Sequence, residues 1–156
     1  MTVYVAVCGP GLAEPSEEAA AEEVGRRLAE AGAILVCGGL GGVMDAAARG
    51  AEAAGGTSIG ILPGTGRIEA SPHITVSIPT GMGEARNALV ARAADALIAI
   101  AGEWGTLSEI ALALKLEKPV VGLGTWRLSK EGSEDPIVRV RTPEEAVARA
   151  LELAGI

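Results

Sequence analysis

Glycine clusters that follow short apolar runs are the residues of this sequence whose chemistry is easiest to name. The clusters are Gly9-Pro10-Gly11, Gly38-Gly39-Leu40-Gly41-Gly42, Gly64, Gly81 and Gly102-Glu103-Trp104-Gly105. Glycine lets the backbone approach a ligand closely, and a helix that follows points free N–H groups and its positive dipole end at the same spot. Phosphate is the natural occupant of such a place.

Turn formation alone could explain any one of these glycines. It is a weaker explanation for residues 38–42, because four glycines in five residues cost backbone entropy without packing against anything. We therefore expect this run to contact a ligand.

Two common nucleotide-binding signatures are absent. Gly9-Pro10-Gly11 and Gly39-Leu40-Gly41 each begin a G-x-G-x-x-G pattern, but Glu14 and Met44 stand at its last position. No ribose-binding acid follows at the usual distance, and no Gly-Lys-Ser/Thr occurs. Ordinary NAD chemistry and P-loop ATP chemistry are therefore disfavoured.

Apolar runs alternate with helical stretches along the whole chain. The pattern predicts helices at residues 16–31, 43–54, 84–94, 106–117 and 143–154, and strands at residues 3–8, 33–37, 57–62, 74–78, 96–101, 119–123 and 137–140. The strands are apolar on both faces, which is typical of a parallel sheet covered by helices. We predict a single α/β domain over residues 1–156, three-layered and Rossmann-like, with a doubly wound, mostly parallel sheet of about six or seven strands. An eight-fold barrel would need a longer chain.

The predicted sheet gives the glycine clusters a common place. Ligands of open α/β sheets bind outside the carboxyl ends of the strands, and most of the glycine clusters follow such ends.

Composition narrows the choice of partners. The net charge is −7, and aromatic residues make up 2% of the chain. Neither nucleic acid nor a membrane surface is therefore an expected partner. No apolar stretch approaches a membrane span in length, and we expect a cytoplasmic protein. Two cysteines and one histidine are too few for a metal cage, so no metal site is expected.

Three segments together resemble the Lonely-guy (LOG) superfamily. They are Gly38-Gly39-Leu40-Gly41-Gly42-Val43-Met44, Arg86-Asn87, and Gly102-Glu103-Trp104-Gly105-Thr106-Leu107-Ser108-Glu109. The best-known members are cytokinin-activating phosphoribohydrolases with a PGGxGTxxE motif and an upstream arginine. A TGxGxARN-like stretch, here Thr80 to Asn87, resembles short bacterial proteins related to molybdenum-cofactor carriers.

The resemblance implies that Arg86 and Glu109 occupy the catalytic positions if the protein is an enzyme. Cleavage of an N-glycosidic bond passes through an oxocarbenium-like state, which a carboxylate can stabilise while an arginine positions phosphate or ribose. The expected ligand- and phosphate-binding residues are Gly9, Pro10, Gly38, Gly39, Gly41, Gly42, Met44, Thr80, Gly81, Arg86, Asn87, Gly102, Glu103, Trp104, Gly105 and Thr106.

Two features argue for caution about Glu109 and the loop before it. Thr106 and Glu109 have the spacing of a capping box, and Thr142 and Glu145 repeat that spacing with no glycine loop, where it must be structural. Where the motif has Pro-Gly-Gly, this chain has Ala101-Gly102-Glu103, so a carboxylate replaces a glycine of the phosphate cradle. Our hypothesis is that Glu103 points away and that the cradle still accepts an anion.

Three functions stay open. The first is a carrier that binds a phosphorylated nucleotide-like ligand or a molybdenum cofactor without turnover. The second is a nucleoside 5′-monophosphate phosphoribohydrolase, which would require no cofactor. The third is a structural or nucleotide-sensing module. The resemblance implies a homodimer or homotetramer, and the Ala- and Leu-rich helices could supply the contact.

Several other residues have a structural interpretation beside any functional one, or a structural one alone. His73 is a surface loop residue or else a base, and Asp95 caps or turns the chain before a strand. Cys8 and Cys37 are expected to be buried, inert thiols at the ends of neighbouring strands. Trp104 could stack on a base, cover the pocket or pack in the core.

Overall fold

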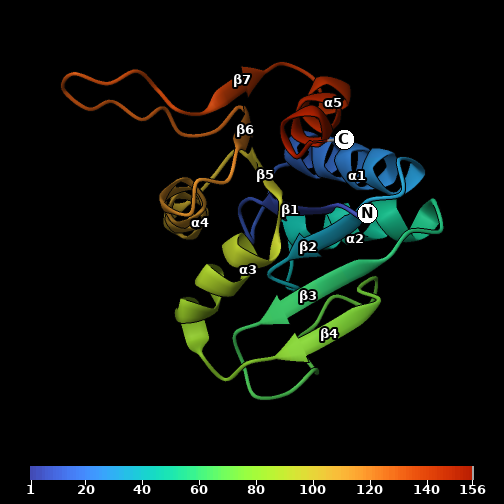
Figure 1. The fold of residues 1–156 in the computed structure, drawn as a ribbon. Coiled ribbons are helices and arrows are strands. Elements are labelled where there is room, and N and C mark those ends of the chain that lie inside the picture. Colours follow the sequence, from blue (N-terminus) through green and yellow to red (C-terminus); the bar gives the residue numbers. More distant parts are fainter. Residues whose placement is uncertain (156) are drawn as a thin grey trace.

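The computed structural model describes residues 1–155, which form one seven-stranded parallel sheet between two layers of helices (Figure 1). The strand order is β4-β3-β2-β1-β5-β6-β7. The strands are β1 (Tyr4–Cys8), β2 (Ile34–Cys37), β3 (Ser58–Leu62), β4 (Val76–Pro79), β5 (Ala96–Ile100), β6 (Val120–Leu123) and β7 (Val138–Val140). The helices are α1 (Pro15–Glu30), α2 (Val43–Ala53), the 3₁₀ turn η1 (Gly83–Arg86), α3 (Asn87–Ala93), α4 (Trp104–Lys115) and α5 (Pro143–Leu153). The predicted three-layer, Rossmann-like class is confirmed.

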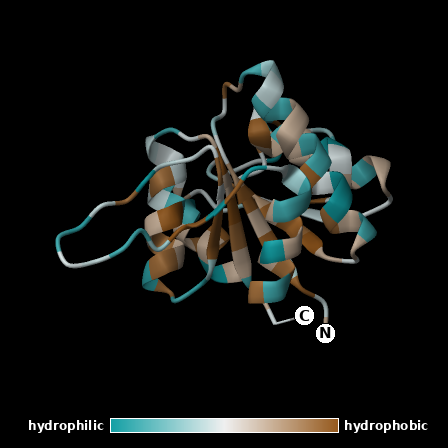
Figure 2. Cartoon of the chain, turned by 90° about the horizontal axis from the view of Figure 1, so that it is seen from above, coloured by the Kyte–Doolittle hydropathy of each residue, from teal (hydrophilic) through white to brown (hydrophobic). Residues whose placement is uncertain are grey.

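The central strands are buried on both faces. All five residues of β5 are buried, and β1 lies beside it with Val5 opposite Ala96. One apolar cluster gathers under α1, α2 and α5, and a second under α3 and α4. Figure 2 shows the resulting brown strands between the two helical layers. Small aliphatic side chains fill both clusters, as the composition requires.

The chain changes faces between β1 and β5. The loop after β1 leads to α1 on one face of the sheet, whereas the loop after β5 leads to α4 on the other. Loops that diverge in this way open a crevice at the carboxyl ends of the strands. The fold therefore places this crevice where the glycine clusters lie.

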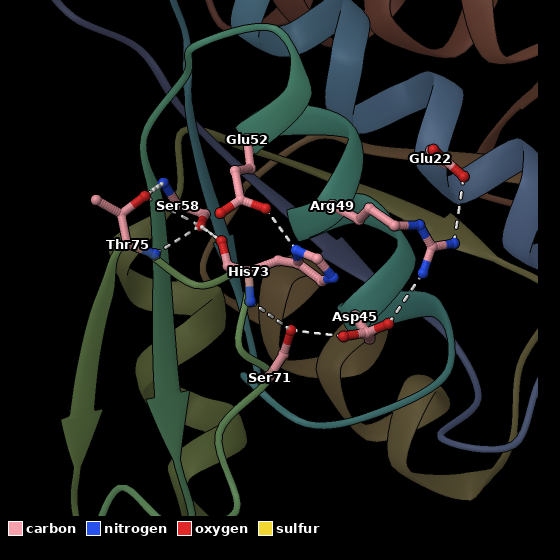
Figure 3. Close-up of polar contacts among 8 residues, drawn as sticks. All are labelled: Glu22, Asp45, Arg49, Glu52, Ser58, Ser71, His73 and Thr75. Atoms are coloured by element: carbon pink, nitrogen blue, oxygen red, sulfur yellow. Dashed lines mark hydrogen bonds and ion pairs between the residues drawn. The ribbon is translucent and has the colours of Figure 1, made fainter.

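The connection from β3 to β4 returns the chain without a helix. Residues 63–75 run along α2, where the Ser71 hydroxyl donates to Asp45 at 2.6 Å (Figure 3). The Ser71 N–H donates to the Gly39 carbonyl at 2.9 Å. Further along, His73 contacts Glu52 in the last turn of α2. His73 thus lies at the opposite end of α2 from the glycine loop.

Over residues 1–155, no helix is long and apolar enough to span a membrane. In the same range, no group of three or more His, Cys, Asp or Glu side chains is arranged to hold a metal ion.

Candidate functional site

Arg86 is buried at the carboxyl edge of the sheet. Its Nε donates to the Ile61 carbonyl at 2.9 Å, and Nη1 donates to Oδ1 of Asn87. The guanidinium lies so close to Gly38 that a Cβ there would come within 2.6 Å of Nη2. Glycine at position 38 is therefore what makes room for the arginine.

Glu109 is buried in the second turn of α4. Its Oε2 is buried and has no hydrogen-bond partner. Burial raises the pKa of Glu109 to about 7, although the nearby positive charge of Arg86 works in the opposite direction. A buried carboxyl oxygen without a donor is rare in proteins and calls for a partner that binds there.

The Glu109 carboxyl lies near the ends of β1 and β2. Burial raises the pKa of Cys37 to about 12 and that of Cys8 well above its ordinary value, and the charge of Glu109 raises both further. Thiols held in this form are poor nucleophiles. The interpretation of both cysteines as buried, inert thiols is thus supported.

The glycines of residues 38–42, hereafter the first loop, are mostly fixed by their neighbours. Gly39 has φ +78° and a Cβ there would lie 2.7 Å from Leu62, while Gly42 has φ +63° and a Cβ there would lie 2.2 Å from the Pro10 carbonyl oxygen. The expectation that these glycines pack against nothing is wrong. Gly41 differs, because a Cβ there would lie 3.4 Å from its nearest neighbour, the Gly11 carbonyl oxygen, which is an ordinary contact.

The first loop leads into a helix whose start has no side-chain cap. Gly42 is the N-cap residue of α2, and the N–H of Val43 donates to the Pro10 carbonyl at 3.1 Å. Met44 follows in the first turn and packs near Gly38. An uncapped first turn next to buried Arg86 is suited to an anion.

Residues 101–105, hereafter the second loop, have a different construction. Ala101 has φ +50°. This is a left-handed conformation that the proline of the family motif could not adopt. A Cβ on Gly102 would lie 3.0 Å from Nε1 of Trp126, which donates to the Glu103 carbonyl at 3.1 Å. The second loop is thus buttressed by the segment that follows β6, which no local pattern in the sequence indicated.

Helix α4 begins at Trp104, two residues before the predicted start. Glu103 is its N-cap residue, in a capping-box arrangement with Thr106, whose hydroxyl accepts from the Glu103 N–H at 3.4 Å. The alternative in which Thr106 and Glu109 form the capping box is therefore wrong, and the Glu103 carboxylate lies at the start of its own helix. The capping role of Thr142 is confirmed, since its hydroxyl accepts from the Glu145 N–H at 3.1 Å.

Trp104 is 73% exposed and lies against Trp126, with ring centroids 5.1 Å apart. It does not pack in the core. A hollow of about 490 Å³ lies beside it, lined also by Gly105, Ser108 and Asn87. Asn87 donates to the Ser108 hydroxyl at 2.9 Å, which ties the start of α3 to α4 across this hollow.

Comparison with known proteins places this chain in a family and identifies similar structures. The family model described as SLOG cluster4 family matches residues 2–147. The chain belongs to the SLOG cluster4 family. This confirms the resemblance to LOG-like proteins that the glycine loops and Arg86-Asn87 indicated.

Two solved structures resemble this SLOG chain over nearly its whole length. The molybdenum cofactor binding protein of Rippkaea orientalis has a TM-score of 0.91 and 34% identity, covering 98% of each chain. The molybdenum cofactor carrier protein of Chlamydomonas reinhardtii has a TM-score of 0.89 and 35% identity, covering 100% of each chain. The cytokinin riboside 5′-monophosphate phosphoribohydrolase LOG of Oryza sativa is 35% identical over 132 residues, 79% of this chain and 52% of that protein.

The remaining expected site residues of this SLOG protein, Thr80 and Gly81, lie in a turn, whereas Asp95, which was interpreted as a capping or turn residue, lies away from them. Thr80 and Gly81 follow β4; the Thr80 hydroxyl donates to the Leu62 carbonyl at 2.7 Å, and Gly81 has φ +65°. They shape the turn that leads to Arg86. Asp95 lies elsewhere, before β5, where its carboxylate accepts from the Tyr4 N–H at 2.9 Å. Asp95 therefore joins two strand starts.

Proposed function

We propose that this protein binds a phosphorylated, nucleotide-like small molecule at the carboxyl edge of its sheet and releases it unchanged. The ligand class is that of a pterin-type cofactor, with the molybdenum cofactor as the cargo. Its phosphate lies at the first loop, against the uncapped start of α2, and its heterocycle reaches the buried carboxyl of Glu109.

One observation carries the proposal: Oε2 of Glu109 is buried beside Arg86 and has no donor. Pterin and purine rings carry N–H groups that can donate to such an oxygen. Arg86 uses its Nε and Nη1 to donate to the Ile61 carbonyl and the Asn87 side chain, and it makes no hydrogen bond to Oε2 of Glu109. An N–H group of a ligand would supply the donor that this oxygen lacks. Support also comes from the two molybdenum-cofactor proteins that this chain resembles from end to end.

The test measures molybdenum in purified protein by inductively coupled plasma mass spectrometry, after expression in cells that make the cofactor. We expect the wild type to retain molybdenum and Glu109→Gln to lose most of it. Glu152→Gln, which removes an exposed carboxylate paired with Arg149, should behave as the wild type. Wild-type protein free of both molybdenum and pterin would overturn the carrier proposal.

A second candidate is hydrolysis of a nucleoside 5′-monophosphate. It is favoured by the position of Glu109 near Arg86 and by its burial, which raises the pKa of the carboxyl to about 7. A carboxylate near that value is suited to proton transfer at neutral pH. Against it stands the Glu103 carboxylate at the start of α4, where the family motif has a phosphate-binding glycine.

Incubation with a panel of nucleoside monophosphates, followed by chromatography for free base, separates the two candidates. Release that is lost in Glu109→Gln supports the hydrolase. Tight binding with no release supports the carrier.

A further inference from the structure

Strands β6 and β7 lie at one edge of the sheet (Figure 1). A second hollow, which is polar, lies at their carboxyl ends. It measures about 670 Å³, and its lining includes Arg127, Arg139 and Arg141 but no carboxylate side chain. The whole chain has 13 Lys and Arg residues and a net charge of −7. Three arginines around one hollow therefore make a local positive region on an acidic protein. We call it the arginine hollow.

Arg139 forms the fixed wall of the arginine hollow. Its Nε donates to Asp135 at 3.2 Å, Nη2 also contacts Asp135, and Nη1 donates to the Thr125 carbonyl at 3.3 Å. Gly122 lies opposite Arg139 in the β6–β7 register, and a Cβ there would come within 2.8 Å of Thr125 and 3.3 Å of Nη1 of Arg139, so these side chains pack directly on the glycine. Asp135 neutralises Arg139, so the excess charge comes from the other two arginines.

Arg127 and Arg141 have free guanidinium groups. Over residues 1–155, no hydrogen bond or ion pair engages either side chain; only the backbone N–H of Arg141 is used, donating to Glu145 at 2.8 Å. Guanidinium presents a fork of N–H donors that matches the oxygens of phosphate. Two such forks facing one hollow are suited to one phosphate or pyrophosphate group.

Charges on an edge strand can also serve to prevent strand pairing between molecules. That explanation fits Arg139 and Arg141, which lie in or directly after edge strand β7. It does not account for Arg127, which comes from the loop after β6. It also does not account for the adjacent hollow of about 380 Å³, which shares Gly124 and Arg141 and extends to Ala101 of the second loop.

We propose that the arginine hollow is a second anion site, which binds a phosphate or pyrophosphate group of a small molecule. Two sources have this chemistry. One is a separate small anion; the other is the distal phosphate of an elongated, dinucleotide-type ligand whose first part occupies the site of Glu109. The second source rests on the proposed function, whereas the first does not.

The first experiment titrates inorganic pyrophosphate by isothermal calorimetry into wild type, Arg127→Gln/Arg141→Gln and the charge-matched control Arg92→Gln/Arg149→Gln. We expect binding to weaken tenfold or more in the first double variant only. In ¹H–¹⁵N spectra, the shifts should fall on the amides of Gly122, Gly124 and Thr125. Equal affinity in all three proteins, or shifts confined to the first loop, would overturn the second site.

The second experiment distinguishes the sources with adenosine monophosphate and diadenosine pyrophosphate. If Arg127→Gln/Arg141→Gln weakens diadenosine pyrophosphate and leaves adenosine monophosphate unchanged, the site takes the distal phosphate of a long ligand. If it weakens only inorganic pyrophosphate, the site takes a separate anion. If Arg127→Gln/Arg141→Gln binds inorganic pyrophosphate and both nucleotides as the wild type does, while Glu109→Gln loses the nucleotides, the proposed function is supported and the arginine hollow is overturned.

Discussion

The first and second loops have similar glycine-rich sequences and lie at the same edge of the sheet, yet different contacts hold them in place. In the first loop, Gly39 and Gly42 have positive φ and touch neighbouring backbone or side chains, and the helix that follows starts without a side-chain cap. In the second loop, Glu103 caps the helix and Trp126 supports the chain from outside.

This difference indicates which loop is followed by a helix start with unpaired backbone N–H groups. A helix start that holds its own carboxylate repels a second anion and uses its N–H groups internally. At the start of α2 the Val43 N–H donates to the Pro10 carbonyl. The one first-turn carboxylate, Asp45, is bound by Ser71 and Arg49. With no side-chain cap at this helix start, the next N–H groups of the turn are open to a ligand. Counting glycines alone would allow a phosphate at either loop, whereas the capping contacts favour the first loop, as we propose.

The largest expected effect of a substitution in these loops is on the free energy of unfolding. Gly42 has φ +63°, and a Cβ there would meet the Pro10 carbonyl. Gly42→Ala should therefore destabilise the protein by about 3 kcal/mol or more, because it adds both backbone strain and a clash.

Gly105 is the matched position in the second loop, and a Cβ there would meet open space in the first turn of α4. Gly105→Ala should gain about 0.5 kcal/mol, since it reduces the freedom of the unfolded chain. Urea unfolding measures both, and equal effects would show that the first loop can move away from Pro10.

The next effect concerns Glu109, which lies between the two loops. Its pKa rises from 4.5 to about 7 on folding. The folded protein therefore holds this proton more tightly, and the free energy of unfolding falls as pH rises between these values. The fall should be roughly 3 kcal/mol. Glu109→Gln should lack it and gain stability relative to wild type above pH 7. Urea unfolding from pH 4.5 to 8.5 tests this.

Glu152→Gln serves as the control for Glu109→Gln, because it removes a carboxylate that is exposed and paired at the surface. Its stability difference from wild type should change little over the same pH range. If Glu109→Gln follows wild type at every pH, then Glu109 is more hydrated than its burial indicates.

The alternation of apolar runs and helical stretches predicted each strand and helix to within two residues, although the helix predicted at 84–94 divides into η1 and α3. It succeeded because both faces of a parallel sheet must be apolar, which short windows of sequence reveal. The strand order was not predictable in the same way. The β3–β4 connection crosses over without a helix and is held by Ser71 and Asp45, a contact between distant residues.

The site was predicted in part for a similar reason. Arg86 and Glu109 were predicted as site residues through their resemblance to a known motif, and the fold brings them near each other. The role of Glu103 was missed because the T-x-x-E spacing of Thr106 and Glu109 fits a cap equally well; the actual helix start depends on Trp126, which binds the Glu103 carbonyl from the far side of β6. Long-range contacts of this kind leave no local signal.

Removing the carboxylate from the second loop should make the two loops more alike. Glu103→Gln frees the start of α4 from a negative charge, so affinity for inorganic phosphate and nucleoside monophosphates should rise about tenfold. The weaker cap should cost about 1 kcal/mol of stability. Calorimetric titration measures the first and urea unfolding the second. Unchanged affinity would mean that no anion approaches the second loop, which would leave the first loop as the phosphate site.

The smallest expected effect comes from the aromatic pair beside the second loop. Trp104 is 73% exposed and contacts Trp126. Trp104→Ala should therefore cost only about 1 kcal/mol, the range of an aromatic pair. Trp126→Ala should cost more, since it also removes the donor to the Glu103 carbonyl. The chain has two tryptophans, so intrinsic tryptophan fluorescence reports on this region alone. If a pterin or nucleotide quenches the fluorescence of the wild type and binds Trp104→Ala more weakly, the ligand contacts the second loop as well as the first loop. If it quenches the fluorescence but binds Trp104→Ala with unchanged affinity, the ligand contacts the first loop only.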